Sequence, residues 1–125
     1  MEQNIYEYCY HPLRFERFLY YRNFEQALFT INQIRTSLEI MAYLTSYRLK
    51  IIDKKVKRII IYLKRIDHEI IKITCDLKQA SNSAKYLLYY AYHCICCNNS
   101  INQPIIMLAL QSELLENELK QVTFF

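Results

Sequence analysis

Residues 49–80 read LKIIDKKVKRIIIYLKRIDHEIIKITCDLKQA, and this stretch decides the fold class that the sequence predicts. Its apolar residues recur at alternating steps of three and four, the heptad spacing of a helix that packs in coiled-coil style. The series comprises Leu49, Ile52, Val56, Ile59, Leu63, Ile66, Ile70, Ile73, Leu77 and Ala80. We therefore predict one straight helix over about 48–80, roughly 50 Å long. The core positions expected to be buried are Ile59, Leu63, Ile66 and Ile70.

The segments on either side of this stretch also show helical spacing. An earlier series comprises Phe24, Ala27, Ile31, Ile34, Leu38 and Met41. Ser83 is a suitable cap for a later helix that carries Leu87, Ala91 and Ile95, and Pro104 suits the first turn of a last helix. We predict an all-α bundle of four or five helices, with an extended tyrosine-rich arm at 1–11 and a single helical-bundle domain at 12–125. Whether 12–47 forms one helix or two stays open.

The composition excludes most catalytic motifs that have a recognisable spacing. The chain contains no glycine and only two prolines among its 125 residues. Gly-rich phosphate loops, dinucleotide fingerprints, nucleophile elbows and nearly every tight β-hairpin need a residue that adopts positive φ readily. We also find no paired carboxylates on one apolar face and no Ser or Cys beside a suitable base. We therefore predict that the chain is not an enzyme, with no catalytic residue and no cofactor.

The five cysteines raise the question of a metal site. Three of them crowd together at the end of a predicted helix, in the cluster His93, Cys94, Cys96 and Cys97. These four side chains cannot converge on one ion from a single helix, and no second Cys-x-x-Cys motif supplies further ligands. We therefore predict no metal and expect thiols that pack between helices, although the sequence does not decide the point.

The amino-terminal sequence and the hydropathy bear on the compartment. Residues 1–4 lack the basic and apolar regions of a signal peptide, so we expect reduced thiols in the cytoplasm. No run of about 18 apolar residues is present, and we expect no membrane partner. The composition, rich in Ile, Lys, Asn, Tyr and Phe, matches AT-rich codons and suggests a virus or mobile element. For a viral protein the compartment would be the host cytoplasm.

Positive charge concentrates in the predicted long helix. The chain carries a net charge of +4, while residues 48–78 alone hold ten cations and four anions. On a heptad these cations fall on the outer positions, where they form a stripe that could track phosphates. The stripe comprises Lys50, Lys54, Lys57, Arg58, Lys64, Arg65 and Lys72. A solvated helix face, or one paired with Glu113, Glu116 and Glu118, is the competing interpretation.

Two functional hypotheses follow. The first is a non-catalytic helical interaction protein that binds other proteins and self-associates, because the apolar positions exceed one seam. Its candidate interface comprises Ile51, Ile60, Ile61, Ile71, Tyr6, Tyr8 and Tyr10. The alternative is a nucleic-acid-binding protein that uses the basic stripe. We favour the first hypothesis, in which the chain is an accessory protein of a virus or mobile element that binds a protein partner and forms homo-oligomers.

Overall fold

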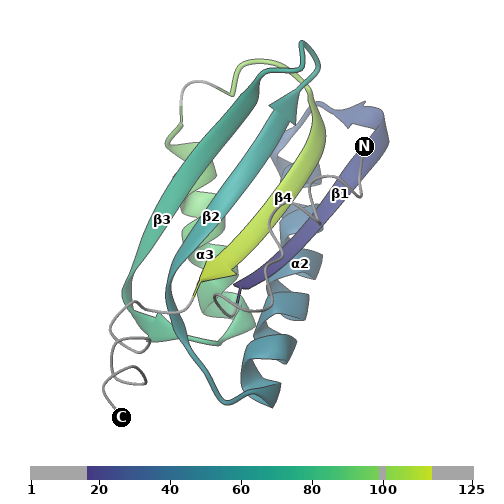
Figure 1. The fold of residues 1–125 in the computed structure, drawn as a ribbon. Helices are drawn as coiled ribbons and strands as arrows, with labels where there is room; N and C mark the ends of the chain where they lie inside the picture. Colours follow the sequence, from purple (N-terminus) through teal and green to yellow (C-terminus); the bar gives the residue numbers. More distant parts are fainter. Residues whose placement is uncertain (1–16, 99–100, 114–125) are drawn as a thin grey trace.

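A computed structural model describes residues 17–98 and 101–113 of the chain. Its elements are β1 (Arg17–Leu28), α2 (Ile31–Ile51), β2 (Val56–Arg65), β3 (Ile70–Ser81), α3 (Ala84–Cys96) and β4 (Ile105–Glu113). The prediction of an all-α bundle is therefore wrong, because the described residues form an α+β fold (Figure 1). The predicted arm at 1–11 lies outside these residues.

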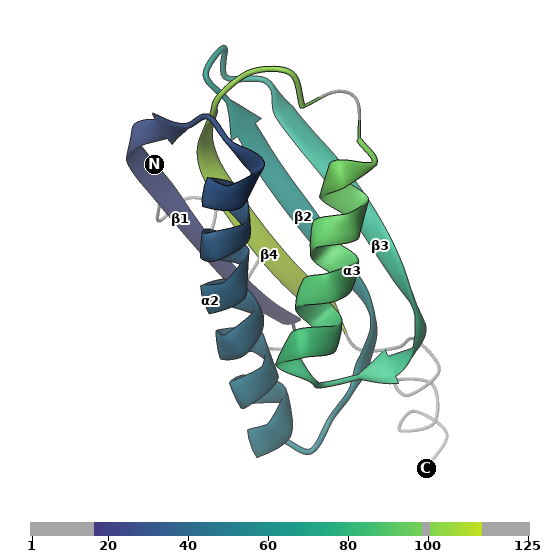
Figure 2. The same cartoon turned by 180° about the vertical axis from the view of Figure 1, so that it is seen from behind.

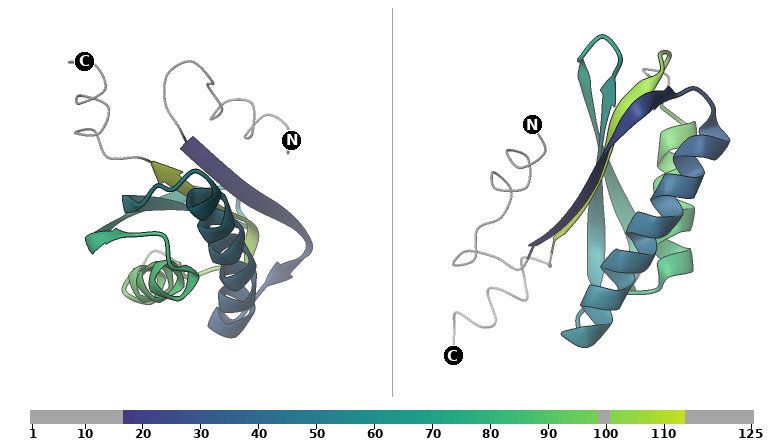
Figure 3. Two further views of the ribbon diagram at one scale, coloured as in Figure 1. Left: turned by 90° about the horizontal axis from the view of Figure 1, so that it is seen from below. Right: turned by 90° about the vertical axis from the view of Figure 1, so that its right-hand side faces the viewer.

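The four strands form one antiparallel sheet in the order β1-β4-β2-β3. Strand β4 pairs antiparallel with both β1 and β2, so β1 and β2 run parallel to each other on either side of it. Helices α2 and α3 both lie on one face of this sheet (Figures 2 and 3). The result is a two-layer architecture in which each helix connects two strands that are not neighbours.

The predicted helix over 48–80 is instead the end of α2 followed by the β2–β3 hairpin. In this stretch the heptad series coexists with a period of two, because Ile59, Ile61 and Leu63 alternate with residues of the other face. Seven isoleucines lie between positions 59 and 73, and β-branched side chains favour a strand over a helix. Ile59 and Leu63 are buried as expected, whereas Ile66 and Ile70 are exposed, because they flank the hairpin turn.

The hairpin turns without glycine. His68 supplies the left-handed conformation with φ of 72°, and Asp53 does the same between α2 and β2 with φ of 56°. The turn is closed by hydrogen bonds from the Arg65 N–H to the Glu69 carbonyl (2.8 Å) and from the His68 N–H to the Arg65 carbonyl (2.8 Å). The absence of glycine therefore did not exclude a hairpin, since polar residues also visit this conformation at a modest cost.

Both helices begin at polar caps. Thr30 and Gln33 form a capping box at the start of α2, with the Thr30 hydroxyl accepting from the Gln33 N–H at 3.2 Å. Ser83 caps α3 as predicted. The helix predicted from Phe24 onward is wrong in its first part, because Phe24 and Ala27 lie on β1. Thus residues 17–51 contribute a strand and a helix, not one helix or two.

The main core lies between the helices and the sheet. It contains Leu38 and Leu49 from α2, Leu87 and Ile95 from α3, and apolar side chains from β2, β3 and β4. A smaller cluster of Leu19, Met107 and Ala109, with Tyr21 and Tyr62 packed against it, lies apart from this core. Strand β4 thus contributes to both clusters, so its sequence shows an unbroken apolar run. The last predicted helix is wrong over 105–113, because these residues form β4. The apolar run alone does not distinguish a helix from a strand.

Candidate nucleic-acid interface

The sheet carries a second face, opposite the one covered by α2 and α3. Successive side chains of a strand point to opposite faces. Since Ile59, Ile61 and Leu63 belong to the main core, the alternate β2 residues Arg58, Ile60, Tyr62 and Lys64 lie on the second face. The strand register aligns them in rows with residues of β3 and β4. These partners on β3 are Asp76, Thr74, Lys72 and Ile70.

The two halves of the second face differ. The β1–β4 half holds the small apolar cluster, in which Leu19, Met107 and Ala109 are buried. The β2–β3 half is more open, since Lys72, Thr74 and Ile70 are exposed and Lys64 is half-buried. Tyr62 lies at the boundary, opposite Lys72 on one side and Ala109 on the other. Polar ligands would therefore meet this face along the hairpin.

Lys64 and Lys72 are the candidate phosphate-binding residues of this face. Lys72 is registered opposite Tyr62, and Lys64 is the next β2 residue on the same face. Such diagonal neighbours have their backbones about 7–8 Å apart. Within the described residues, neither lysine forms an ion pair. Their ammonium groups are therefore not neutralised by any carboxylate of residues 17–98 and 101–113.

Arg58 occupies the other end of the same face and is already engaged. Its Nε donates to Asp76 Oδ1 at 2.8 Å, with both side chains more than half exposed (54% and 67%). Glu113 is registered opposite Arg58 on β4 and accepts from the Gln111 amide at 2.8 Å. Arg58 is therefore paired with Asp76, whereas Lys64 and Lys72 form no ion pair with another described residue.

Arg65 is engaged in the hairpin turn. Its Nε donates to Asp67 Oδ1 at 3.1 Å, and a second guanidinium N–H donates to Oδ2 of the same carboxylate. A further bond reaches Asn102 Oδ1 at 3.3 Å. The hydrogen bond from Arg65 lowers the pKa of Asp67 to about 2, and the same bond raises the pKa of Arg65. Arg65 thus stabilises the turn that ends β2.

The remaining predicted cations lie at the α2–β2 corner. Lys50 is in the last turn of α2, Lys54 is in the connection, and Lys57 is near the start of β2. The Lys54 backbone is held by a bond from its N–H to the Leu49 carbonyl (2.9 Å) and by the Asn82 amide, which donates to its carbonyl (3.2 Å). The predicted continuous stripe does not exist, because it required one helix over 48–80.

The predicted protein-interface residues are scattered by the fold. Ile61 is fully buried under the helices and Ile60 is buried on the second face, so the chain itself covers both. Ile71 is half-buried against the main core, and Ile51 is exposed at the end of α2. Tyr6, Tyr8 and Tyr10 lie outside the described residues.

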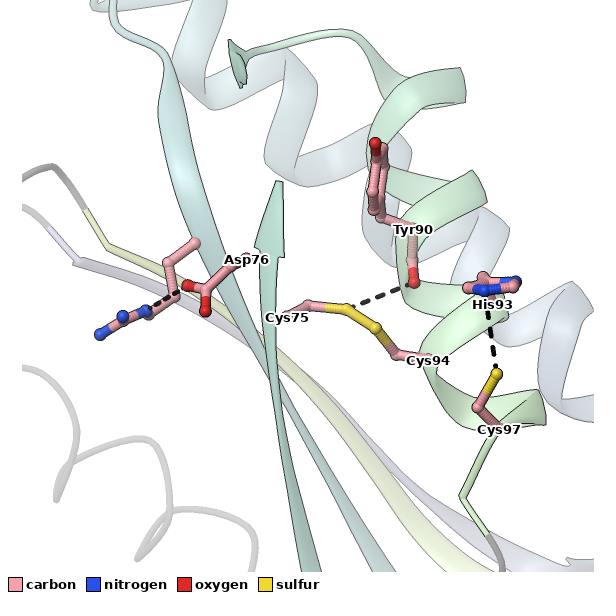
Figure 4. Close-up of a disulfide and its surroundings, with 7 residues drawn as sticks. Cys75, Asp76, Tyr90, His93, Cys94 and Cys97 are labelled. Atoms are coloured by element: carbon pink, nitrogen blue, oxygen red, sulfur yellow. Dashed lines mark hydrogen bonds and ion pairs between the residues drawn. A yellow bond between two sulfur atoms is a disulfide. The ribbon is translucent and has the colours of Figure 1, made fainter. Parts of the chain in front are cut away.

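The predicted cluster of His93, Cys94, Cys96 and Cys97 does not converge on one point, because Cys94 and the His93–Cys97 pair make separate contacts (Figure 4). Cys94 forms a disulfide with Cys75 of β3, across a Cα–Cα distance of 6.6 Å. His93 and Cys97 instead face each other, with Nε2 and Sγ 3.8 Å apart, and Cys96 is exposed. The expectation of reduced thiols is wrong for the Cys75–Cys94 pair. Among the described residues, no group of three or more His, Cys, Asp or Glu side chains could hold a metal ion.

In the part of the chain that the structure describes, no helix is both long and apolar enough to span a bilayer.

Solved structures with a similar fold belong to DNA polymerases. A little finger domain of PolIV, in complex with a β-clamp processivity factor, matches with a TM-score of 0.66 and 14% identity, over 81% of this chain and 90% of that one. The Dbh DNA polymerase matches in an insertion ternary complex, with a TM-score of 0.61, 10% identity and coverage of 80% and 28%. Its post-insertion binary complex matches with a TM-score of 0.60, 10% identity and coverage of 89% and 33%.

This chain therefore corresponds to about a third or less of the matched Dbh polymerase chains. No protein-family model matches the sequence, and no curated protein matches it significantly. The likeness establishes a little-finger-like α+β fold. It overturns the hypothesis of a self-associating helical interaction protein, which depended on surplus apolar positions along a single long helix.

Proposed function

We propose that this chain is a nucleic-acid-binding domain that holds duplex DNA against the second face of its sheet and performs no chemistry itself. The observation that carries the proposal is the pair Lys64 and Lys72, which are adjacent on that face and form no ion pair with another described residue. The fold supports it, because the similar structures include complexes of a DNA polymerase.

The proposed contact is with the backbone of a duplex. Lys64 and Lys72 are diagonal neighbours across β2 and β3 and so form one compact positive patch on the second face. Lysine acts as a point charge toward phosphate, so the proposed contact reads the backbone and carries little base specificity.

The aromatic residues of the face favour a duplex over an unpaired strand. Stacking of unpaired bases needs rings that present a free surface. Tyr21 and Tyr62 are instead packed against the cluster of Leu19, Met107 and Ala109. Phosphate contacts by Lys64 and Lys72 therefore dominate the proposed interaction.

Fluorescence anisotropy with a labelled duplex of about 20 base pairs tests the proposal. The variant Lys72→Glu is matched by Lys85→Glu on α3, because both reverse one exposed lysine and only their layer differs. We expect Lys72→Glu to weaken binding far more than Lys85→Glu. The pair Lys64→Glu and Lys72→Glu should reduce the slope of log affinity against log salt by about 1.8, or about 0.9 for each phosphate contact.

A corner variant separates the two positive regions. Reversing Lys50, Lys54 and Lys57 to Glu changes the charge at the α2–β2 corner and leaves the second face intact. If this variant loses DNA binding while the double variant Lys64→Glu and Lys72→Glu retains it, the second face is not the site. Tighter binding to a single strand than to the duplex would contradict the proposed substrate. Thermal melting of each variant checks that the fold is preserved.

A further inference from the structure

The end of α3 carries a histidine and a free cysteine on one face. The Cys97 N–H donates to the His93 carbonyl at 3.1 Å, so the two residues lie one turn apart. Residues at this spacing are neighbours on the surface of a helix. Their side chains face each other, with His93 Nε2 and Cys97 Sγ 3.8 Å apart (Figure 4). Cys94 turns instead toward Cys75 of β3, so the disulfide does not involve this pair.

The separation of the two donor atoms suits a metal ion. Zn²⁺ binds a histidine nitrogen at about 2.0–2.1 Å and a cysteine sulfur at about 2.3 Å, with tetrahedral angles. A nitrogen and a sulfur on the same ion are therefore about 3.6 Å apart. The observed distance of 3.8 Å between Nε2 and Sγ is close to that value. An ion can thus enter between His93 and Cys97 with little movement of the helix.

The surroundings of the pair favour a cation. His93 and Cys97 are both exposed, so an ion reaches them directly from solvent. Tyr89, one turn earlier, holds its ring nearly parallel to the His93 imidazole, with 10° between the ring planes. The pair also lies in the last turn of α3, where the unsatisfied carbonyls give the end of a helix partial negative charge.

The donor atoms define the class of metal. Imidazole nitrogen and thiolate sulfur suit Zn²⁺ and similar transition metals, whereas Mg²⁺ and Ca²⁺ take oxygen ligands. Within the described residues no third His, Cys, Asp or Glu joins His93 and Cys97. Two of the four positions around the ion therefore remain for water. The prediction of no metal concerned four side chains converging on one ion, and a site with two protein ligands does not need that convergence.

We propose that His93 and Cys97 together bind one Zn²⁺ ion, or a similar divalent transition metal, and leave two of its coordination positions open to water. On binding, the Cys97 thiol gives up its proton to solvent, and the thiolate and His93 Nε2 each donate an electron pair to the ion. The site lies at the end of α3 in the helical layer, whereas the proposed DNA contact lies on the other face of the sheet (Figure 2). The inference does not rest on DNA binding, and the two can fail separately.

Cobalt spectroscopy of the full chain tests the site. Co²⁺ accepts the same nitrogen and sulfur ligands as Zn²⁺, and a cobalt–thiolate bond gives a charge-transfer absorption that nitrogen and oxygen ligands do not give. The chain is prepared metal-free under argon, which keeps Cys97 reduced, and without added thiols, which would compete for the metal. We expect this absorption to saturate near one Co²⁺ per chain and to disappear when Zn²⁺ is added. Excess Mg²⁺ should leave it unchanged.

Three variants locate the ligands. Cys97→Ser and His93→Ala each remove one of the two donors and should each weaken Co²⁺ and Zn²⁺ binding at least about tenfold. Cys97→Ser should also abolish the thiolate absorption. The matched control is Cys96→Ser, because Cys96 is the neighbouring free and exposed thiol, and it should leave the affinity and the absorption unchanged. All three residues are exposed, so the variants should fold, and thermal melting checks this. Duplex DNA binding should be the same in all three.

Several outcomes would overturn the proposal. A natural chain without the cobalt–thiolate absorption, or equal losses in Cys96→Ser and Cys97→Ser, would show that the pair is not the site. Cys9 and His11 lie outside the described residues, and a double variant Cys9→Ser and His11→Ala should bind the metal normally. A loss as large as that of Cys97→Ser would instead show that these residues complete the coordination. Half an equivalent of metal per chain, with the light-scattering mass of a dimer, would replace the open site by one shared between two copies.

Discussion

Helix α3 and the β2–β3 hairpin have similar apolar spacing and opposite structures. In α3, Leu87, Ala91 and Ile95 recur at steps of four and are all buried, as a helix requires. In the hairpin, Ile59, Leu63, Ile66, Ile70 and Ile73 also recur at steps of three and four. Only part of this second series is buried, because it crosses a turn. Spacing at three and four is thus necessary for an amphipathic helix and insufficient to identify one.

Residue type separates the two regions. Between Ala84 and Cys96 there is one β-branched residue, Ile95, and the helix begins at the Ser83 cap. The hairpin has consecutive isoleucines at positions 59–61 and 70–71. Consecutive β-branched residues point to both faces of a strand and lose side-chain freedom in a helix. The conformational preference of isoleucine therefore outweighs the heptad series in this chain.

The largest expected effect comes from two successive positions of the apolar series, Leu63 on β2 and Ile66 just beyond the end of that strand. Leu63→Ala should lower the free energy of unfolding by about 2–5 kcal/mol, because Leu63 is fully buried and its truncation leaves a cavity. Ile66→Ala should change it by less than about 0.5 kcal/mol, because Ile66 is exposed beside the turn. Urea unfolding measures both. Equal losses of stability from the two substitutions would instead favour the single helix predicted over 48–80, because Leu63 and Ile66 are equivalent core positions in that helix.

The contrast between α3 and the β2–β3 hairpin also explains which elements of the fold could be predicted from the sequence. Local signals were sufficient for α3, for its Ser83 cap and for the buried positions Ile34, Leu38 and Met41 of α2. The sheet depends on pairing between distant segments, since β4 inserts between β1 and β2 from 105–113. Nothing local in residues 105–110 indicates that insertion, and an unbroken apolar run fits a helix as well.

The candidate site was predictable in part. Lys64 and Lys72 were both among the predicted phosphate-binding cations, although for a helix that does not exist. The sequence could not show that Arg58 is neutralised by Asp76, because that contact joins residues 18 positions apart across the hairpin. The alternation of Arg58, Tyr62 and Lys64 with Ile59, Ile61 and Leu63 was the missed signal. That period of two places the first three residues on one face of a strand.

The Ser83 cap offers a test of the comparison at the start of α3. Its hydroxyl accepts from the Tyr86 N–H at 3.4 Å, at the first turn of α3. Ser83→Ala should lower the free energy of unfolding by about 1 kcal/mol, and Ser83→Asp should retain most of it. Thermal unfolding of the three proteins checks this. If Ser83→Asp were as unstable as Ser83→Ala, the hydroxyl would not be acting as a helix cap.

The hairpin turn should respond in the opposite direction to a change at His68. His68→Gly should raise the free energy of unfolding by about 0.5 kcal/mol, because relief of the left-handed conformation exceeds the added entropy of the unfolded chain. The matched control is Glu69→Gly, since Glu69 has negative φ and gains no such relief. Urea unfolding compares them. A loss of stability in His68→Gly similar to that in Glu69→Gly would argue against the left-handed turn.

The smallest expected effect is the pH dependence of the same turn. The hydrogen bond from Arg65 lowers the pKa of Asp67 from 3.8 to about 2, so ionised Asp67 stabilises the folded state. A lowered pKa contributes stability that is fully present above about pH 4 and is lost as the pH falls through about 2. The stability difference between the natural chain and Asp67→Asn should therefore be present at pH 6, shrink below pH 4 and nearly vanish at pH 2. Because the pair is at the surface, 0.5 M salt should reduce the difference. Unfolding curves that keep a constant separation down to pH 2 would show that the Asp67 charge does not stabilise the turn, and that backbone geometry alone holds this hairpin closed.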